Sequence, residues 1–152
     1  MILPILKNPH TALDTVCTEW GFTASDKVVN ELETNMIETM LAAKGIGLAA
    51  NQVGILERFM AMNLLSNNQC LIMYNPKLIS ISEETETIPE GCLSFPGQSY
   101  TVTRNKSIVV EYQDRYQNYH RKTLQGWDAR CFLHELDHLN GITFDERVNN
   151  VH

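Results

Sequence analysis

Two histidines one helical turn apart flank a glutamate in the segment His134-Glu135-Leu136-Asp137-His138. On an α-helix, residues i and i+4 lie on the same face, so both imidazoles can bind one metal ion. Glu135 is expected beside that face, within reach of a water molecule on the ion. Two histidines do not complete a tetrahedral site, so a third ligand must come from elsewhere in the chain. The spacing therefore predicts a metal-dependent hydrolase.

The third ligand is predicted to be Cys92, in the segment Glu90-Gly91-Cys92-Leu93-Ser94. A thiolate with two imidazoles gives a Cys-His-His site whose fourth position stays open to water, as in catalytic metal sites. The four cysteines show no CxxC spacing, and the first apolar run is too short for a signal peptide. We therefore expect free thiols and a cytoplasmic protein.

The size and charge of the chain limit its partners. A length of 152 residues predicts a single catalytic domain over 1–152, and 43% hydrophobic with 20% charged residues is a globular composition. The net charge of −6 argues against nucleic acid or an anionic membrane as a partner. No stretch is long and apolar enough to span a bilayer. We expect a monomer.

Two helices are predicted from the spacing of apolar residues. The first is amphipathic, begins after Thr23 or Ser25 and ends at Lys44-Gly45. The second covers 126–140 and carries both histidines. Its apolar or functional residues fall on two faces, so this helix should run through the middle of the domain.

Strands are predicted where short apolar runs are bounded by turn-forming residues, at 58–63, 71–75 and 78–81. A late hairpin joins 107–114 to 119–124. The acidic stretch 82–90 is expected to be a solvated loop or a sheet edge. The chain is therefore expected to be α+β, with mostly antiparallel sheets packed around the central histidine-bearing helix.

Taken together, three segments resemble the three motifs of the peptide deformylases, in the order that this family has them. They are Gly45-Ile46-Gly47-Leu48-Ala49-Ala50-Asn51-Gln52, Glu90-Gly91-Cys92-Leu93-Ser94 and His134-Glu135-Leu136-Asp137-His138. The resemblance covers about residues 1–148. It implies hydrolysis of the N-formyl group from the initiator formyl-methionine of nascent polypeptides, with release of formate.

The resemblance implies that Cys92, His134 and His138 hold one divalent ion, with Fe²⁺ favoured as the native metal. Thiolate and imidazole ligands would also accept Zn²⁺, Ni²⁺ or Co²⁺. Such an ion lowers the pKa of bound water toward roughly 7, so that hydroxide can attack the formyl carbon at neutral pH. Glu135 would take the water's proton and deliver it to the leaving amine. The Gln52 side-chain amide and the Leu93 backbone N–H would stabilise the oxyanion.

The substrate is expected to lie as an added strand against Gly45, Ile46 and Gly47 and the strand near Gly91. Its methionine side chain is expected in a pocket lined by Ile46, Ile88, Trp127, Arg130, Cys131 and the His134 ring. Glu90 is a candidate to orient His134 or to pair with Arg104, and Asp137 is an alternative to it.

The chain departs from many family members after Gly141, where only eleven residues follow. Those members continue into a C-terminal helix, which in bacterial enzymes is associated with docking on the ribosome. We expect a short form without that helix, in at most transient contact with the ribosome. Such brevity suits an enzyme encoded by a virus, which would act in the cytoplasm of a bacterial host.

Two alternatives remain open. A noncatalytic peptide-binding relative on the same scaffold is disfavoured by Glu135 and Gln52, because neither residue is needed to hold a metal. An HExxH metalloprotease would need a further glutamate or histidine ligand on a following helix, for which the residues after Gly141 leave little space.

Overall fold

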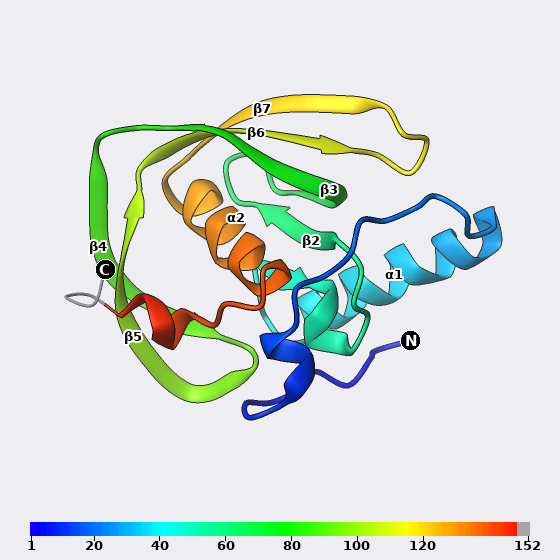
Figure 1. Ribbon diagram of the computed structural model, residues 1–152, viewed down its shortest axis with the longest axis horizontal. Coiled ribbons are helices and arrows are strands. Elements are labelled where there is room, and N and C mark those ends of the chain that lie inside the picture. Colours follow the sequence, from blue (N-terminus) through cyan, green and yellow to red (C-terminus); the bar gives the residue numbers. More distant parts are fainter. Residues whose placement is uncertain (149–152) are drawn as a thin grey trace.

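The computed structural model describes residues 1–148, which form two antiparallel sheets around one helix (Figure 1). The helices are α1 (Asp26–Ala42) and α2 (Gly126–Leu139), with 3₁₀ turns at η1 (Thr11–Asp14), η2 (Ala50–Val53) and η3 (Phe144–Arg147). The strands are β1 (Gly47–Ala49), β2 (Phe59–Leu64), β3 (Gln69–Ile81), β4 (Thr85–Cys92), β5 (Phe95–Asn105), β6 (Ser107–Gln113) and β7 (Tyr119–Gln125).

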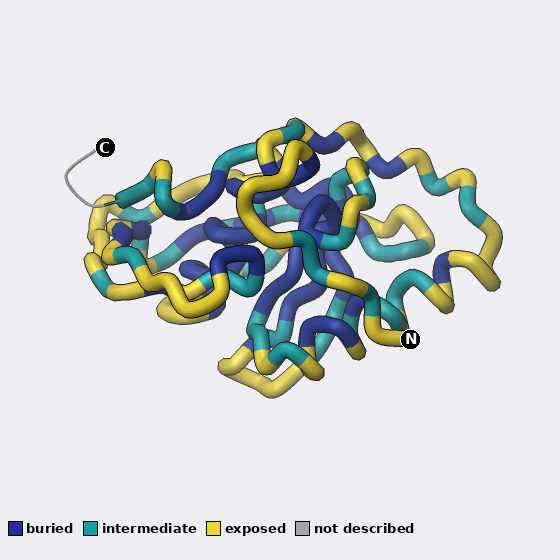
Figure 2. The backbone as a smooth tube through the Cα atoms, turned by 90° about the horizontal axis from the view of Figure 1, so that it is seen from below, coloured by how far each residue is buried: buried dark blue, intermediate teal, exposed yellow. Residues whose placement is uncertain are grey.

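One sheet has five strands in the order β1-β2-β3-β6-β7, and the other is the β4-β5 hairpin. Every pairing is antiparallel. Helix α2 contacts strands of both sheets, and most of its residues are buried. Figure 2 shows the buried residues gathered in the middle of the molecule and the exposed ones on its outside. The α+β prediction, with the histidine-bearing helix at the centre, is confirmed.

Helix α1 begins at the predicted cap and leads directly into the first motif. The Ser25 hydroxyl accepts a hydrogen bond from the Val28 N–H, and Met36 and Met40 are buried on the inner face. At the other end, Lys44 has a φ of 59° and the Gly45 N–H donates to the Met40 carbonyl, which closes the helix. Strand β1 then forms the edge of the larger sheet, paired on one side only.

Two of the strand predictions differ from the structure. The runs 71–75 and 78–81 belong to one strand, β3, whose register shifts between Tyr74 and Lys77 and again before Ser80. The turn-like residues between the runs, Asn75 with a φ of 49° and Pro76, therefore bend the strand without ending it. Strand β5 was not predicted, because most of its residues are polar and exposed.

The remaining elements follow the sequence closely. The acidic stretch forms most of β4, in agreement with a sheet edge, and β6 and β7 form the predicted hairpin. The second helix ends at Leu139, followed by Gly141 with a φ of 71°. None of the helices within residues 1–148 has the length and apolar character needed to span a bilayer.

Candidate metal and catalytic site

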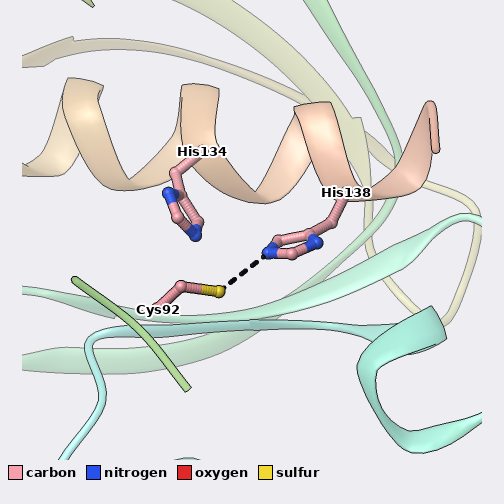
Figure 3. A group of neighbouring side chains, drawn as sticks. All are labelled: Cys92, His134 and His138. Carbon is pink, nitrogen blue, oxygen red and sulfur yellow. Dashed lines mark hydrogen bonds between the residues drawn. The ribbon is translucent and has the colours of Figure 1, made fainter. Parts of the chain in front are cut away.

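Cys92, His134 and His138 come together at one point between the hairpin and the central helix. Their potential ligand atoms all lie within 4.8 Å of one another, and Cys92 Sγ is 3.3 Å from His138 Nε2. Figure 3 shows both imidazoles pointing from α2 toward the thiol, which stands at the end of β4. Helical i, i+4 spacing aligns the histidines, and the return of β4 toward the helix supplies the sulfur.

The three residues fit a divalent ion that accepts sulfur and nitrogen. His134 Nδ1 contacts the Glu90 carboxylate at 3.0 Å, which leaves Nε2 of the same ring to face the cluster. A carboxylate behind a histidine is the usual arrangement at metal sites, because it fixes the tautomer and the ring orientation. All four cysteines are free thiols, as predicted, so Cys92 is available as a ligand.

Glu90 is held from several directions at once. Besides His134, its carboxylate accepts hydrogen bonds from Arg104, at 3.0 and 3.1 Å, and from Arg130. Burial alone would raise the pKa of Glu90, but the hydrogen bonds from His134 and Arg104 and the Arg104 charge lower it to about 2. Arg104 also donates to Asp137 at 2.6 Å. Glu90 therefore both orients His134 and pairs with Arg104, while Asp137 contacts the network through Arg104.

Glu135 lies at the buried base of the site. One of its oxygens, Oε1, has no hydrogen-bond partner among residues 1–148. Burial raises the pKa of Glu135 to about 7, with the neighbouring His134 acting in the opposite direction. A carboxyl group with a near-neutral pKa and a free oxygen can accept and release a proton at neutral pH.

Gln52 has its amide fixed in one orientation. Its Oε1 accepts a hydrogen bond from the Ala49 N–H at 2.9 Å, and its Nε2 donates to Ser94 Oγ at 3.1 Å. The same nitrogen is 3.9 Å from Cys92 Sγ. The amide N–H₂ group therefore faces the thiol, while the carbonyl oxygen satisfies the turn that follows β1.

A cavity of about 600 Å³ opens over these groups. The predicted site residues that line it are Gly45, Ile46, Gly47, Gln52, Gly91, Cys92, Leu93, Trp127, Arg130, Cys131, His134 and Glu135. His138 is buried next to this lining, in contact with Cys92. The structure thus brings residues from η2, β1, β4 and α2 to one place.

Ile88 is the exception among the predicted pocket residues. It lines a separate hollow of about 50 Å³, together with Glu86 and Arg104, and is absent from the main lining. Trp127 and Arg130 line both spaces and so stand between them. Ile88 is therefore separated from the main cavity by these two large side chains.

Arg130 forms hydrogen bonds that its place in the sequence did not indicate. Its guanidinium donates to Glu90, to the Val102 carbonyl at 2.9 Å and to the Glu86 carbonyl at 2.6 Å. Arg130 therefore ties α2 to both strands of the hairpin and binds the same carboxylate as Arg104. Arg130 was expected only to line the methionine pocket, and nothing in the sequence indicated which strands its head group would reach.

The motifs, their spacing in the fold and the cavity can be compared with known proteins. The family model described as polypeptide deformylase matches residues 2–152. The chain belongs to the peptide deformylase family. The resemblance seen in the three motifs is thereby confirmed over nearly the whole sequence.

Individual peptide deformylases are similar to this chain in sequence and in structure. The enzyme of Wolbachia pipientis wMel is 39% identical over 161 aligned positions, covering 99% of this chain and 89% of the relative. The crystal structure of the Thermotoga maritima peptide deformylase superposes with a TM-score of 0.92 at 37% identity, covering 98% and 99% of the two chains. An Acinetobacter baumannii peptide deformylase bound to Met-Ala-Ser superposes with a TM-score of 0.90 at 30% identity, covering 97% and 99%.

Proposed function

We propose that this chain is a single catalytic unit that removes the N-formyl group from the initiator formyl-methionine of nascent polypeptides and releases formate. One observation carries the proposal: the Cys92, His134 and His138 cluster lies against the cavity that is lined by the Glu135 carboxylate and the Gln52 amide. Three protein ligands leave a position open for chemistry. Glu135 and Gln52 are not needed to hold an ion, and both are placed to act on a substrate.

Cys92, His134 and His138 would hold one divalent ion, for which we propose Fe²⁺ as the native metal and Zn²⁺, Ni²⁺ or Co²⁺ as substitutes. When bound, the ion supplies the Lewis acidity that brings the pKa of a water molecule near neutrality. Glu90 holds the His134 ring in place from behind, at 3.0 Å from Nδ1.

Glu135 moves the protons. Its unpartnered Oε1 takes a proton from the attacking water and delivers it to the methionine nitrogen as the carbon–nitrogen bond breaks. The second transfer matters because an amine is a poor leaving group unless it is protonated. The buried position of Glu135 keeps bulk water from competing for this proton.

Gln52 stabilises the negative charge that grows on the formyl oxygen. Because Ala49 and Ser94 already fix the amide, its N–H₂ group faces the reacting centre before substrate arrives. The Leu93 backbone N–H, next to Cys92 in the cavity lining, is the proposed second donor.

The peptide is proposed to bind along the free edge of β1, as an additional strand. Gly47 is required there because a Cβ would lie 2.5 Å from Cys131 Sγ and 2.7 Å from Glu135 Oε2. The methionine side chain would enter the cavity toward Ile46, Trp127 and Cys131. The Acinetobacter baumannii peptide deformylase of the same fold was crystallised with Met-Ala-Ser bound, which supports a short peptide as the ligand.

The direct test is hydrolysis of formyl-Met-Ala-Ser by protein purified anaerobically and loaded with Fe²⁺, Ni²⁺ or Co²⁺. We expect stoichiometric formate and free amine, and no reaction with acetyl-Met-Ala-Ser, whose larger acyl group must fit against Gln52. A metal-loaded protein that binds the peptide without releasing formate would be a noncatalytic relative. Cleavage inside the acetylated peptide would identify a metalloprotease.

A further inference from the structure

Two lysines stand at one end of the main cavity. Lys7 and Lys44 both line it, and both are exposed. The Lys7 ammonium donates to the Leu93 carbonyl at 3.2 Å, and the Leu93 side chain comes within 2.8 Å of where a Cβ on Gly45 would lie. Since Gly45 directly follows Lys44, the two positive charges flank the same stretch of the cavity mouth.

Neither lysine is neutralised by an acidic side chain. Within the described part of the chain, no ion pair involves Lys7 or Lys44. The carboxylates in the cavity lining, Glu90 and Glu135, are both buried at its base, and Glu90 is already paired with arginines. The cavity mouth is therefore positive in a chain whose net charge is −6.

The backbone fixes where Lys44 stands relative to a bound peptide. Gly47 marks the reacting end of the β1 edge, because a Cβ there would touch Glu135. Lys44 precedes Gly47 by three residues, in the turn between α1 and β1, so the two Cα atoms are at most about 10 Å apart. An extended peptide that runs from Gly47 toward Gly45 covers this distance by about its third or fourth residue.

We propose that Lys7 and Lys44 make this enzyme select formyl-peptides that carry an acidic side chain at the third or fourth residue. The inference rests on the proposed deformylase function and adds a charge preference to it. Because both ammonium groups are exposed, their attraction for a carboxylate is moderate and is screened by salt. We expect kcat/KM at low ionic strength to be about three- to fivefold higher for an acidic residue than for its neutral isostere.

The experiment compares formyl-Met-Ala-Asp-Ala-amide with formyl-Met-Ala-Asn-Ala-amide on the metal-loaded enzyme. Amidated peptides are used because a free terminal carboxylate would itself be attracted to the lysines. The Asp peptide should be the better substrate, and its advantage should fall toward one in about 0.5 M salt. Lys7→Gln and Lys44→Gln should each reduce the Asp-to-Asn ratio of kcat/KM, and Lys44→Glu should invert it.

Lys77→Gln is the matched control, since Lys77 is an exposed lysine on β3 outside the cavity lining. It should keep the wild-type ratio. Equal kcat/KM values for the two peptides in the wild type would overturn the inference, as would an unchanged ratio in the Lys7→Gln/Lys44→Gln double variant. Absence of formate from both peptides would instead refute the proposed function.

Discussion

The Glu90 carboxylate lies 3.0 Å from Nδ1 of His134, at the centre of a buried group of charges that joins the hairpin to the central helix. The same carboxylate forms ion pairs with Arg104 and Arg130, so one side chain connects the orientation of a ligand with the packing of the hairpin against α2. The metal site and the fold therefore depend on each other at this point.

Glu90→Gln should weaken metal binding. The amide cannot accept hydrogen bonds at both of its polar atoms, so it leaves at least one arginine donor without its partner and loosens His134. Loss of such a supporting group typically lowers metal affinity about 10–100-fold, which chelator competition would measure. Glu86→Gln is the control, because the half-exposed Glu86 side chain lies on the same strand and should leave affinity unchanged. Equal affinity in both variants would contradict the role given to Glu90.

Glu135→Gln should separate chemistry from metal binding. The amide is nearly isosteric but cannot accept the water's proton, so kcat should fall by about 10²–10⁴. The metal content after reconstitution should stay at one ion per chain, because Glu135 is outside the Cys92, His134 and His138 cluster. Turnover within threefold of the wild type would show that another group moves the proton.

Gln52→Leu should reduce both rate and stability, for different reasons. Loss of the amide donor removes one oxyanion contact, which typically costs about 10²–10³ in kcat. Loss of the carbonyl oxygen removes the hydrogen bond from the buried Ala49 N–H, which typically costs about 0.5–1.5 kcal/mol in the free energy of unfolding. Formate release and urea unfolding would measure the two effects. A stability loss with an unchanged rate would make Gln52 a purely structural residue.

Gly47→Ala and Gly45→Ala should differ although both add one methyl group. At Gly47 the new Cβ would meet Cys131 Sγ at 2.5 Å and two atoms of Glu135. At Gly45 it would meet the end of the flexible Leu93 side chain, at 2.8 Å, which can rotate away. We expect Gly47→Ala to lose about 1–3 kcal/mol of stability and most activity, and Gly45→Ala to fold normally. Thermal unfolding and formate release on both variants would check this, and equal losses would contradict it.

The sequence was sufficient for the parts of the site that depend on local spacing. His134 and His138 follow from the helical period alone, and Ser25 and Gly141 marked helix ends. Cys92 was expected as the third ligand because a thiolate completes a catalytic site with two imidazoles, whereas the role of Gln52 required the resemblance to a family. How closely both residues approach α2 depends on a hairpin and a 3₁₀ turn that fold back over long distances in the chain. The bridging role of Arg130 and the separation of Ile88 depend on side-chain packing between the hairpin and α2, which no pattern in the sequence indicates.

Stability at high pH should depend on Tyr74. Its hydroxyl donates to Glu33 at 2.7 Å, and burial together with Glu33 raises the pKa of Tyr74 well above its ordinary value of 10. The unfolded chain therefore ionises this phenol first, so the stabilising contribution is present below about pH 10 and is lost as the pH rises beyond it. Above that pH, the free energy of unfolding should fall by up to about 1.4 kcal/mol per pH unit for each such group.

Urea unfolding between pH 8 and pH 11 would measure this fall in the wild type and in Tyr74→Phe. The variant should be less stable near neutral pH, because the bond to Glu33 is lost, but its stability should decline less steeply above pH 10. Burial also raises the pKa of Tyr112, so part of the decline should remain in the variant. Tyr116→Phe is the control, because it removes a tyrosine hydroxyl from a side chain that is 71% exposed. Parallel slopes in the wild type and in Tyr74→Phe would show that Tyr74 does not titrate differently on unfolding.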